Sequence, residues 1–134
     1  MDLFFDAVSS QGCIALFDEN RVLCARGDVC VMGNESKQLP ALIGDFLKEN
    51  KADYTQLQNI VCVVGPGSFT AIRMITLIVN TLAYIYPHIS LTTLSFFDLY
   101  DSYPIVKTSS KRDLFVKWKK TAIIEVLENS VFFE

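Results

Sequence analysis

The spacing of hydrophobic residues predicts a sheet whose strands alternate with helices. Three short apolar segments come first, at residues 3–6, 12–18 and 21–28. Glu19 and Asn20 suit a tight turn between the second and third segments. Strands joined by such short connections pair in antiparallel fashion, so we expect a three-stranded meander at the start of the chain.

The spacing of apolar residues changes after the third segment and predicts a first helix over residues 36–49. Apolar side chains recur there every three or four positions and form one stripe. Asn34 or Ser36 can cap its start, and Pro40 fits the first turn, where a missing N–H costs least. This helix therefore has one face for a core and one face for solvent.

A second, longer helix is predicted over residues 69–86. Ser68 is a suitable N-cap, and Pro87 stops the helix. Its apolar residues lie nearly all round, which is typical of a helix buried on more than one side. We therefore expect another chain to cover part of it.

The remaining apolar segments complete an α/β pattern. Residues 59–64 form an apolar run rich in β-branched residues, which suits a strand covered on both faces. Ser95 can cap a short helix that ends near residue 101. Further strands are expected at residues 89–93, 105–108 and 114–118, whereas the type of 122–127 and 131–133 is left open. A meander followed by β-α-β-α units predicts a mixed sheet with helices packed on it.

Composition limits the classes of function. The chain has 134 residues, of which 51% are hydrophobic and 20% charged, which suits one packed core and argues against disorder. No apolar run approaches the roughly 20 residues of a membrane span, and the first residues do not resemble a signal peptide, so we expect a cytoplasmic protein. A net charge of −3 argues against general nucleic-acid binding. Six cations near the end suit either a solvated hairpin or a phosphate-binding patch: Lys107, Lys111, Arg112, Lys117, Lys119 and Lys120.

The cysteines do not predict a metal site. No two of them have C-x-x-C spacing, and His88 is the single histidine. Buried reduced thiols are the expected state, because free cysteine packs as a small hydrophobic residue. The residues concerned are Cys13, Cys24, Cys30 and Cys62.

One motif carries chemical information, G-P-G-S-F-T-A-I-R at residues 65–73. A glycine turn at a helix start lets backbone N–H groups approach an anion. The motif lacks the lysine of a P-loop and the G-x-G-x-x-G pattern of dinucleotide sites. Both a structural turn and an anion or nucleotide contact remain open. The candidate contact residues are Asp6, Gly65, Gly67, Ser68, Thr70 and Arg73.

This motif is similar to the G-P-G-S-F-T-G-L-R signature of the TsaB family, also called YeaZ. Residues 5–10, F-D-A-V-S-S, look like the family's opening I-D-T-A-T-E. Residues 35–39, E-S-K-Q-L, look like its H-S-K-Q-L, and residues 94–99 lie where it has S-L-x-x-L. The resemblance covers roughly residues 1–118.

The resemblance implies half of the actin-like (ASKHA) ATPase fold, with one subdomain over residues 1–103 and a remnant of the second over 104–134. TsaB proteins are non-enzymatic relatives of the TsaD synthase. They bind TsaD through their first two long helices and support formation of threonylcarbamoyladenosine in tRNA. The resemblance implies a scaffold without catalytic residues, metal or cofactor, with nucleotide only at a partner interface and direct tRNA contact left open. The expected partner-binding residues are Leu39, Leu42, Ile43, Phe46, Ala71, Ile75, Ile78, Val79 and Leu82.

Departures from the family keep other functions open. Ala7 replaces a threonine that relatives use near phosphate, and Ile75 and Val79 are larger than the family's small residues. The second family domain is almost absent, so we expect self-association to cover exposed surface, with a homodimer when TsaD is absent. The alternatives are a divergent homodimerising module without the tRNA role and an actin-like-fold, nucleotide-dependent enzyme.

Overall fold

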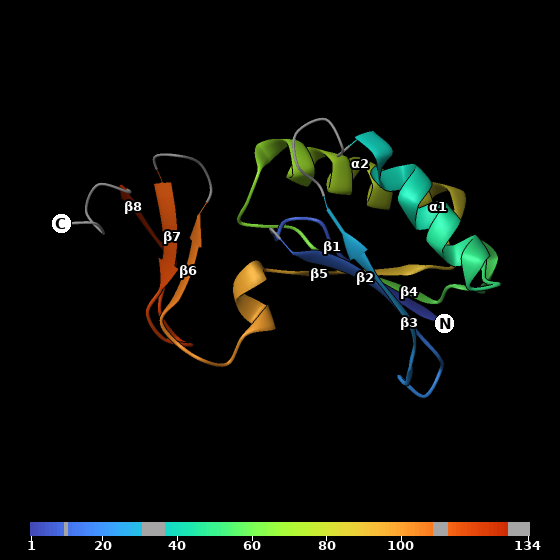
Figure 1. Ribbon diagram of the computed structural model, residues 1–134, viewed down its shortest axis with the longest axis horizontal. Coiled ribbons are helices and arrows are strands. Elements are labelled where there is room, and N and C mark those ends of the chain that lie inside the picture. Colours follow the sequence, from blue (N-terminus) through green and yellow to red (C-terminus); the bar gives the residue numbers. More distant parts are fainter. Residues whose placement is uncertain (10, 31–36, 109–112, 129–134) are drawn as a thin grey trace.

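The computed structural model describes residues 1–9, 11–30, 37–108 and 113–128. These residues form a five-stranded sheet, two α-helices that lie over it and a separate three-stranded sheet (Figure 1). Within them, no helix combines the length and apolar character needed to cross a membrane.

The large sheet has the order β3-β2-β1-β4-β5. Strands β1 (Asp2–Asp6), β2 (Gly12–Phe17) and β3 (Leu23–Val29) pair in antiparallel fashion and confirm the predicted meander. Strand β4 (Asn59–Val63) is parallel to β1, and β5 (Ser90–Leu94) is parallel to β4. The sheet is therefore mixed, as predicted.

Helices α1 (Leu39–Glu49) and α2 (Phe69–Ile85) form the connections into the parallel strands, and both lie over the same face of the sheet (Figure 1). The core lies between them and the sheet. Phe5 of β1, Ile43 of α1 and Ile75 of α2 are each 0% exposed. Pro40 lies in the first turn of α1, as predicted.

The predicted N-cap role of Ser68 is only half right. Ser68 occupies the N-cap position of α2, but its side chain makes no capping hydrogen bond. At the start of α1, Gln38 occupies the N-cap without a side-chain bond, while Asn34 and Ser36 lie outside the described residues. Neither Gln38 nor Ser68 therefore caps its helix through a side chain, and both helices pack their buried faces on the sheet.

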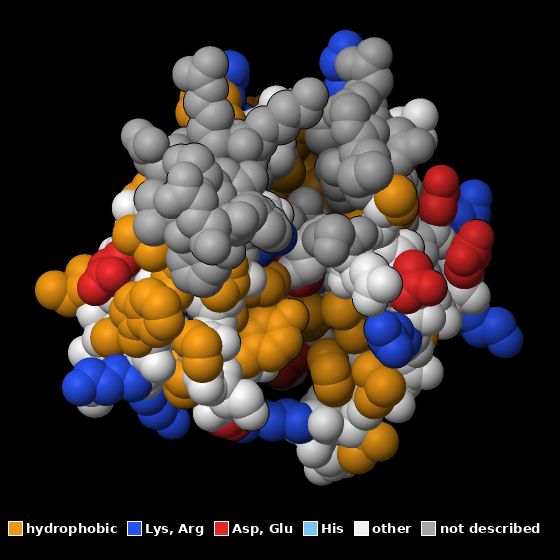
Figure 2. Space-filling view, turned by 60° about the vertical axis from the view of Figure 1, so that its left-hand side comes forward, with side chains coloured by type: hydrophobic (Ala, Val, Ile, Leu, Met, Phe, Trp, Pro, Cys, Tyr) orange, Lys and Arg blue, Asp and Glu red, His pale blue; other side chains and the backbone are white. Residues whose placement is uncertain are grey.

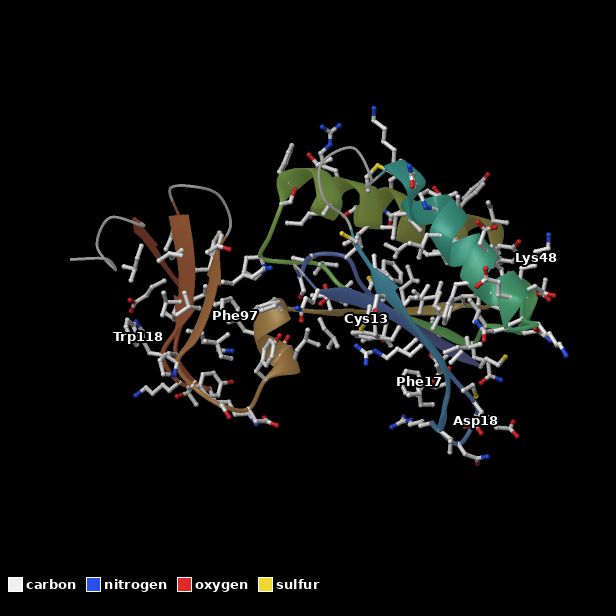
Figure 3. All side chains as sticks on the ribbon, viewed as in Figure 1. Cys13, Phe17, Asp18, Lys48, Phe97 and Trp118 are labelled. Atoms are coloured by element: carbon white, nitrogen blue, oxygen red, sulfur yellow. The ribbon has the colours of Figure 1, made fainter. Side chains whose placement is uncertain are left out.

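Two 3₁₀ turns follow the helices. The first, η2 (Tyr54–Gln56), precedes β4, and the second, η3 (Phe96–Leu99), follows β5. Ser95 caps η3 as predicted, because its Oγ accepts a hydrogen bond of 3.3 Å from the Phe97 N–H. The turn ends at Leu99 rather than near residue 101. Figure 3 shows Phe97 on the side of η3 toward the small sheet, and this side chain is fully buried.

The small sheet contains β6 (Ile105–Thr108), β7 (Asp113–Lys117) and β8 (Glu125–Glu128), all antiparallel. The predicted hairpin is confirmed. The segment 122–127, whose type the pattern left open, contributes part of β8, whereas 131–133 lies outside the described residues. Figure 2 turns this sheet toward the viewer and shows hydrophobic side chains gathered on that face of the molecule. The exposed apolar residues of this region include Val106, Trp118, Ile123 and Val126.

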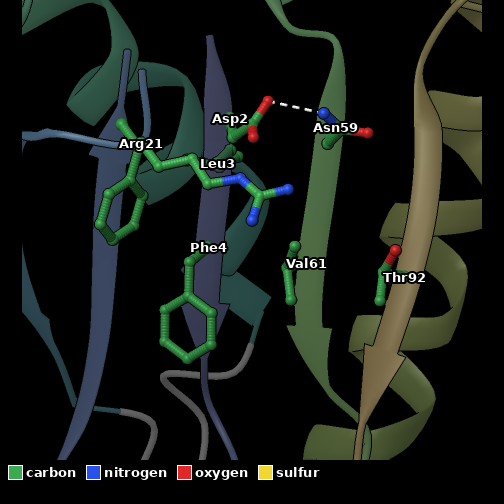
Figure 4. Close-up of a pocket in the computed structure, with 8 residues that line it drawn as sticks. Asp2, Leu3, Phe4, Arg21, Asn59, Val61 and Thr92 are labelled. Atoms are coloured by element: carbon green, nitrogen blue, oxygen red, sulfur yellow. Dashed lines mark hydrogen bonds between the residues drawn. The ribbon is translucent and has the colours of Figure 1, made fainter. Parts of the chain in front are cut away.

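The prediction that β4 is covered on both faces is wrong. Val61 lines an open hollow of about 520 Å³, together with Phe4 and Thr92 of the neighbouring strands (Figure 4). At one end of this hollow, Asn59 Nδ2 donates a 2.7 Å hydrogen bond to Asp2 Oδ1. The physical reason is topological. Both crossover helices lie on one face, so no described helix covers the other.

The thiols differ from the expectation that all are buried. Cys62 is buried, and burial raises the pKa of its thiol to about 11. Cys24 and Cys30 are exposed, and Cys13 is intermediate. Cys24 is exposed because β3 lies at the edge of the sheet, where most of its residues face solvent.

Candidate functional site

The carboxylate of Asp6 accepts hydrogen bonds from the turn that follows β1. This residue is 4% exposed, and its Oδ1 accepts hydrogen bonds from the backbone N–H of Val8 (2.9 Å) and of Ser9 (3.0 Å). Its Oδ2 accepts a hydrogen bond from the Ser9 hydroxyl. Asp6 therefore acts as a turn former at the strand end, since local donors already occupy its oxygens.

The glycine turn packs directly against the Asp6 turn. Gly65 has a φ of +131°, a backbone conformation that residues other than glycine rarely adopt. A Cβ on Gly67 would overlap Cγ1 of Val8. Close packing of these two turns thus accounts for Gly67, and the positive φ accounts for Gly65, which favours the structural turn of the two interpretations that the motif left open.

The predicted anion-contact residues fall into two groups, and anion binding by either group stays a prediction. Thr70 and Arg73 line a hollow on the outer side of α2, and neither Asp6 nor the two glycines contribute to its lining. The guanidinium carbon of Arg73 lies 5.4 Å from the centre of the Phe69 ring. In the part of the chain that the structure describes, no group of three His, Cys, Asp or Glu residues could hold a metal ion.

Lys107 connects the two sheets, a role that the sequence pattern does not predict. It extends from β6, and its Nζ donates a 2.9 Å hydrogen bond to the carbonyl oxygen of Val8. The same ammonium group lies 4.7 Å from the centre of the Phe96 ring. Burial lowers the pKa of Lys107, and the negative charge of Asp6 partly opposes that shift. Lys107, one of the six cations near the end of the sequence, therefore makes its contacts within this chain.

The residues predicted to bind a partner belong instead to the core of this chain. All of them except half-buried Leu42 are buried: Leu39, Ile43, Phe46, Ala71, Ile75, Ile78, Val79 and Leu82. The reason is that their helical stripe faces the sheet. In this fold those side chains are not available to a second chain, and this corrects the positions proposed from the sequence.

The opposite face of α2 is open and largely apolar. Phe69, Leu77 and Tyr84 are 73%, 61% and 89% exposed, respectively. The hydroxyl groups of Thr76 and Thr81 donate to the helix carbonyls of Ile72 and Leu77 at 2.9 and 2.8 Å. Because these hydroxyls are satisfied within the helix, the two threonines add little polarity to the surface. A second apolar stripe beside the buried one was the signal in the sequence for this face.

Charge on this face is sparse and of one sign. Arg73 is the sole charged side chain in the sequence of α2. Next to the helix lies a hollow of about 580 Å³, and among the described residues its lining adds Lys37 and no carboxylate. The lining residues are Lys37, Thr70, Ile72, Arg73, Met74, Thr76, Leu77 and Asn80.

Among solved structures, this arrangement matches YeaZ from Pseudomonas aeruginosa. The TM-score is 0.69 over 94% of this chain and 66% of that chain, with 16% sequence identity. The chain has the fold of the part of YeaZ that it covers. The YeaZ fold is an actin-like α/β fold, and the predicted fold class is confirmed.

A second solved structure supports the same fold. It is described as an uncharacterised protein with similarity to peptidase YeaZ from Pseudomonas aeruginosa, and it matches with a TM-score of 0.71 at 15% identity. Here 94% of this chain covers 65% of that chain, so the chain spans just under two thirds of both YeaZ-like structures. No protein-family model and no curated protein sequence matches the chain. The comparisons therefore show the fold, and function has to be argued from the surface.

Proposed function

We propose that this chain is a non-catalytic, TsaB-type scaffold that binds a TsaD-like synthase in the formation of threonylcarbamoyladenosine in tRNA. The YeaZ fold and the motif at residues 65–73 support the TsaB-type assignment. The open face of α2 carries the proposal that the chain works by binding another protein.

That face has the composition of a protein interface. Exposed Phe69, Leu77 and Tyr84 lie on one side of a helix with a single charge. Full burial of a large apolar side chain contributes about 1.5–3 kcal/mol, so a partner that covers these residues gains a substantial driving force. Exposed apolar patches of this kind mark interaction sites on otherwise globular proteins.

The site near Asp6 supports a role without catalysis. Its carboxylate accepts hydrogen bonds from the turn, Gly67 packs closely on Val8, and Gly65 has the positive φ that the glycine turn needs. We therefore expect the isolated protein neither to hydrolyse ATP nor to cleave peptides. Metal-dependent turnover that disappears in Asp6→Ala would favour the nucleotide-dependent enzyme instead.

Binding to the TsaD-like synthase of the same genome tests the proposal. Sedimentation velocity should show a complex with the wild type and at least a tenfold weaker one with Leu77→Asp, since a charge is placed on an apolar interface. Val22→Asp is a matched control, because Val22 is similarly exposed (59%) in the turn between β2 and β3. Equal binding by Leu77→Asp, or no binding by the wild type, would contradict the proposal.

The same experiment separates the homodimerising alternative. A wild type that sediments as a dimer, loses this state in Leu77→Asp and ignores the synthase would identify a second copy as the partner. A homodimer that forms only in the absence of the synthase stays a prediction of the scaffold proposal.

A further inference from the structure

Strand β5 is the last strand at one side of the large sheet in the described part of the chain, and its outer edge is open. Ser90, Leu91, Thr92 and Thr93 are all exposed, and Leu91 has 36% of its surface in contact with solvent. We propose that this edge pairs with β5 of a second copy, in antiparallel fashion, across a two-fold axis at Thr92. The inference goes beyond the proposed function, because it concerns the edge of the sheet and not the outer face of α2.

The backbone of β5 has hydrogen-bonding groups that point away from the sheet. The N–H of Ser90 and the carbonyl oxygen of Leu94 bond to the residues that flank β4, at 2.8 and 2.9 Å. Because the backbone groups of successive strand residues point to opposite sides, those of Leu91 and Thr93 face outward. Such a row of donors and acceptors is a template for another strand.

Antiparallel pairing centred on Thr92 satisfies these outward groups. In this register Leu91 lies opposite Thr93 of the second copy, and both residues have outward groups to exchange as hydrogen bonds. The two-fold axis repeats that pair on its other side and places Thr92 opposite its own counterpart. Threonine pairs stabilise antiparallel strands. The contact uses the same surface on both copies, so it closes into a dimer and does not extend into a filament.

Charge does not guard this edge, in contrast to the opposite edge of the same sheet. The sequence has no Asp, Glu, Lys or Arg between Arg73 and Asp98. Strand β3, at the other edge, carries Arg26 and Asp28, whose side chains are 64% and 93% exposed, and its pairing with β2 contains a register shift. Charges and irregularities of this kind keep sheet edges apart. The lack of charge on β5 favours a second copy of the same strand, because a charged strand would repel itself at a two-fold axis.

Charge exchange at the axis tests the pairing. Thr92→Lys and Thr92→Glu should each weaken self-association roughly fivefold, because like charges then lie opposite one another. An equimolar mixture of the two variants should regain at least the wild-type affinity. Sedimentation velocity over the micromolar range measures the variants and their mixture. Figure 4 shows Thr92 beside Val61 at the open hollow, so a longer side chain has room in the monomer.

A proline variant tests the backbone contact. Thr93→Pro removes an outward N–H from each copy and should weaken self-association roughly tenfold. Its urea midpoint should stay close to that of the wild type, because proline is tolerated on an edge strand where the N–H faces solvent. Arg26→Glu is the matched control, since it reverses an exposed charge on the opposite edge strand and should leave self-association unchanged. If Thr93→Pro does not fold, the mixture of Thr92 variants still decides the question.

Each contrary result overturns the inference in a recognisable way. Self-association that the Thr92 variants leave unchanged and Leu77→Asp abolishes would place the contact on α2. An effect of Arg26→Glu as large as that of Thr92→Glu would indicate pairing of β5 with β3 of the next copy. A wild type that stays monomeric would refute the second copy, and synthase binding weakened by Thr93→Pro would then show that a strand of the synthase occupies the edge. Synthase binding in any of these cases leaves the scaffold role intact, whereas a β5 dimer that ignores the synthase refutes only that role.

Discussion

Helices α1 and α2 occupy equivalent places in the fold, yet their solvent faces differ. Both connect into a parallel strand, and both lie over the same face of the large sheet. The outer side of α1 exposes Asp45, Lys48 and Glu49. The outer side of α2 exposes Phe69, Leu77 and Tyr84 and a single charge.

The comparison separates what the fold requires from what it does not. The inner faces are alike, because each helix buries a stripe of aliphatic side chains against the sheet. The charged outer face of α1 shows that a crossover helix here needs no apolar outer surface. The apolar outer face of α2 is therefore not explained by folding, and this is why we assign it to binding.

The largest expected effect contrasts the two faces of α2. Ile75→Asp should unfold the protein or cost more than about 3 kcal/mol, because an unpaired charge enters the core. Leu77→Asp, two positions along, should change stability by less than about 0.5 kcal/mol, since Leu77 is exposed. Urea unfolding followed by circular dichroism measures both. Equal midpoints would show that the assignment of inner and outer faces is wrong.

A smaller effect is expected from the packing of Gly67 against Val8, just before α2. Gly67→Ala should destabilise the protein by about 1–3 kcal/mol, because the added methyl group overlaps Val8. Val8→Ala should relieve part of this cost, so that the double variant is more stable than the sum of the two changes predicts. If the stability changes of the two single variants simply add in the double variant, the overlap with Val8 does not explain why residue 67 is glycine.

Substitution of a glycine inside α1 should change stability in the opposite direction. Gly44 lies inside α1, and a Cβ there would meet only the Tyr54 hydroxyl, at an ordinary contact distance of 3.7 Å. Gly44→Ala should stabilise the protein by about 0.5–1 kcal/mol, because alanine is the better helix former. A thermal unfolding scan that showed a lower midpoint would reveal a contact between α1 and its surroundings that this structure does not contain.

The smallest effect is expected at the start of α2. Ser68→Ala should shift stability by less than about 0.5 kcal/mol, because the Ser68 side chain makes no capping bond. Ser95→Ala should cost on the order of 1 kcal/mol, since Ser95 forms a reciprocal cap with Asp98. The difference between the two urea midpoints is the measurement. A larger loss of stability in Ser68→Ala than in Ser95→Ala would show that the Ser68 side chain caps α2, as its position in the sequence predicts.

Local patterns were sufficient for most of the elements of this protein. The apolar run in residues 12–18, the helical period of residues 39–47 and the position of Ser95 are each local signals over a few neighbours, and the structure confirms the elements that they predict. The fold class followed from the order of those elements, since parallel strands need crossover connections. These features need no knowledge of which residues meet across the chain.

Only the tertiary structure decided which face of α2 is inside. The pattern of α2 is apolar nearly all round, so the sequence could not tell buried Ile75 from exposed Leu77. The packing of Gly67 on Val8, and the reach of Lys107 to the Val8 carbonyl across 99 positions of sequence, likewise depend on distant segments coming together. Periodicity records that a side chain is apolar, whereas its exposure depends on what the rest of the chain places against it.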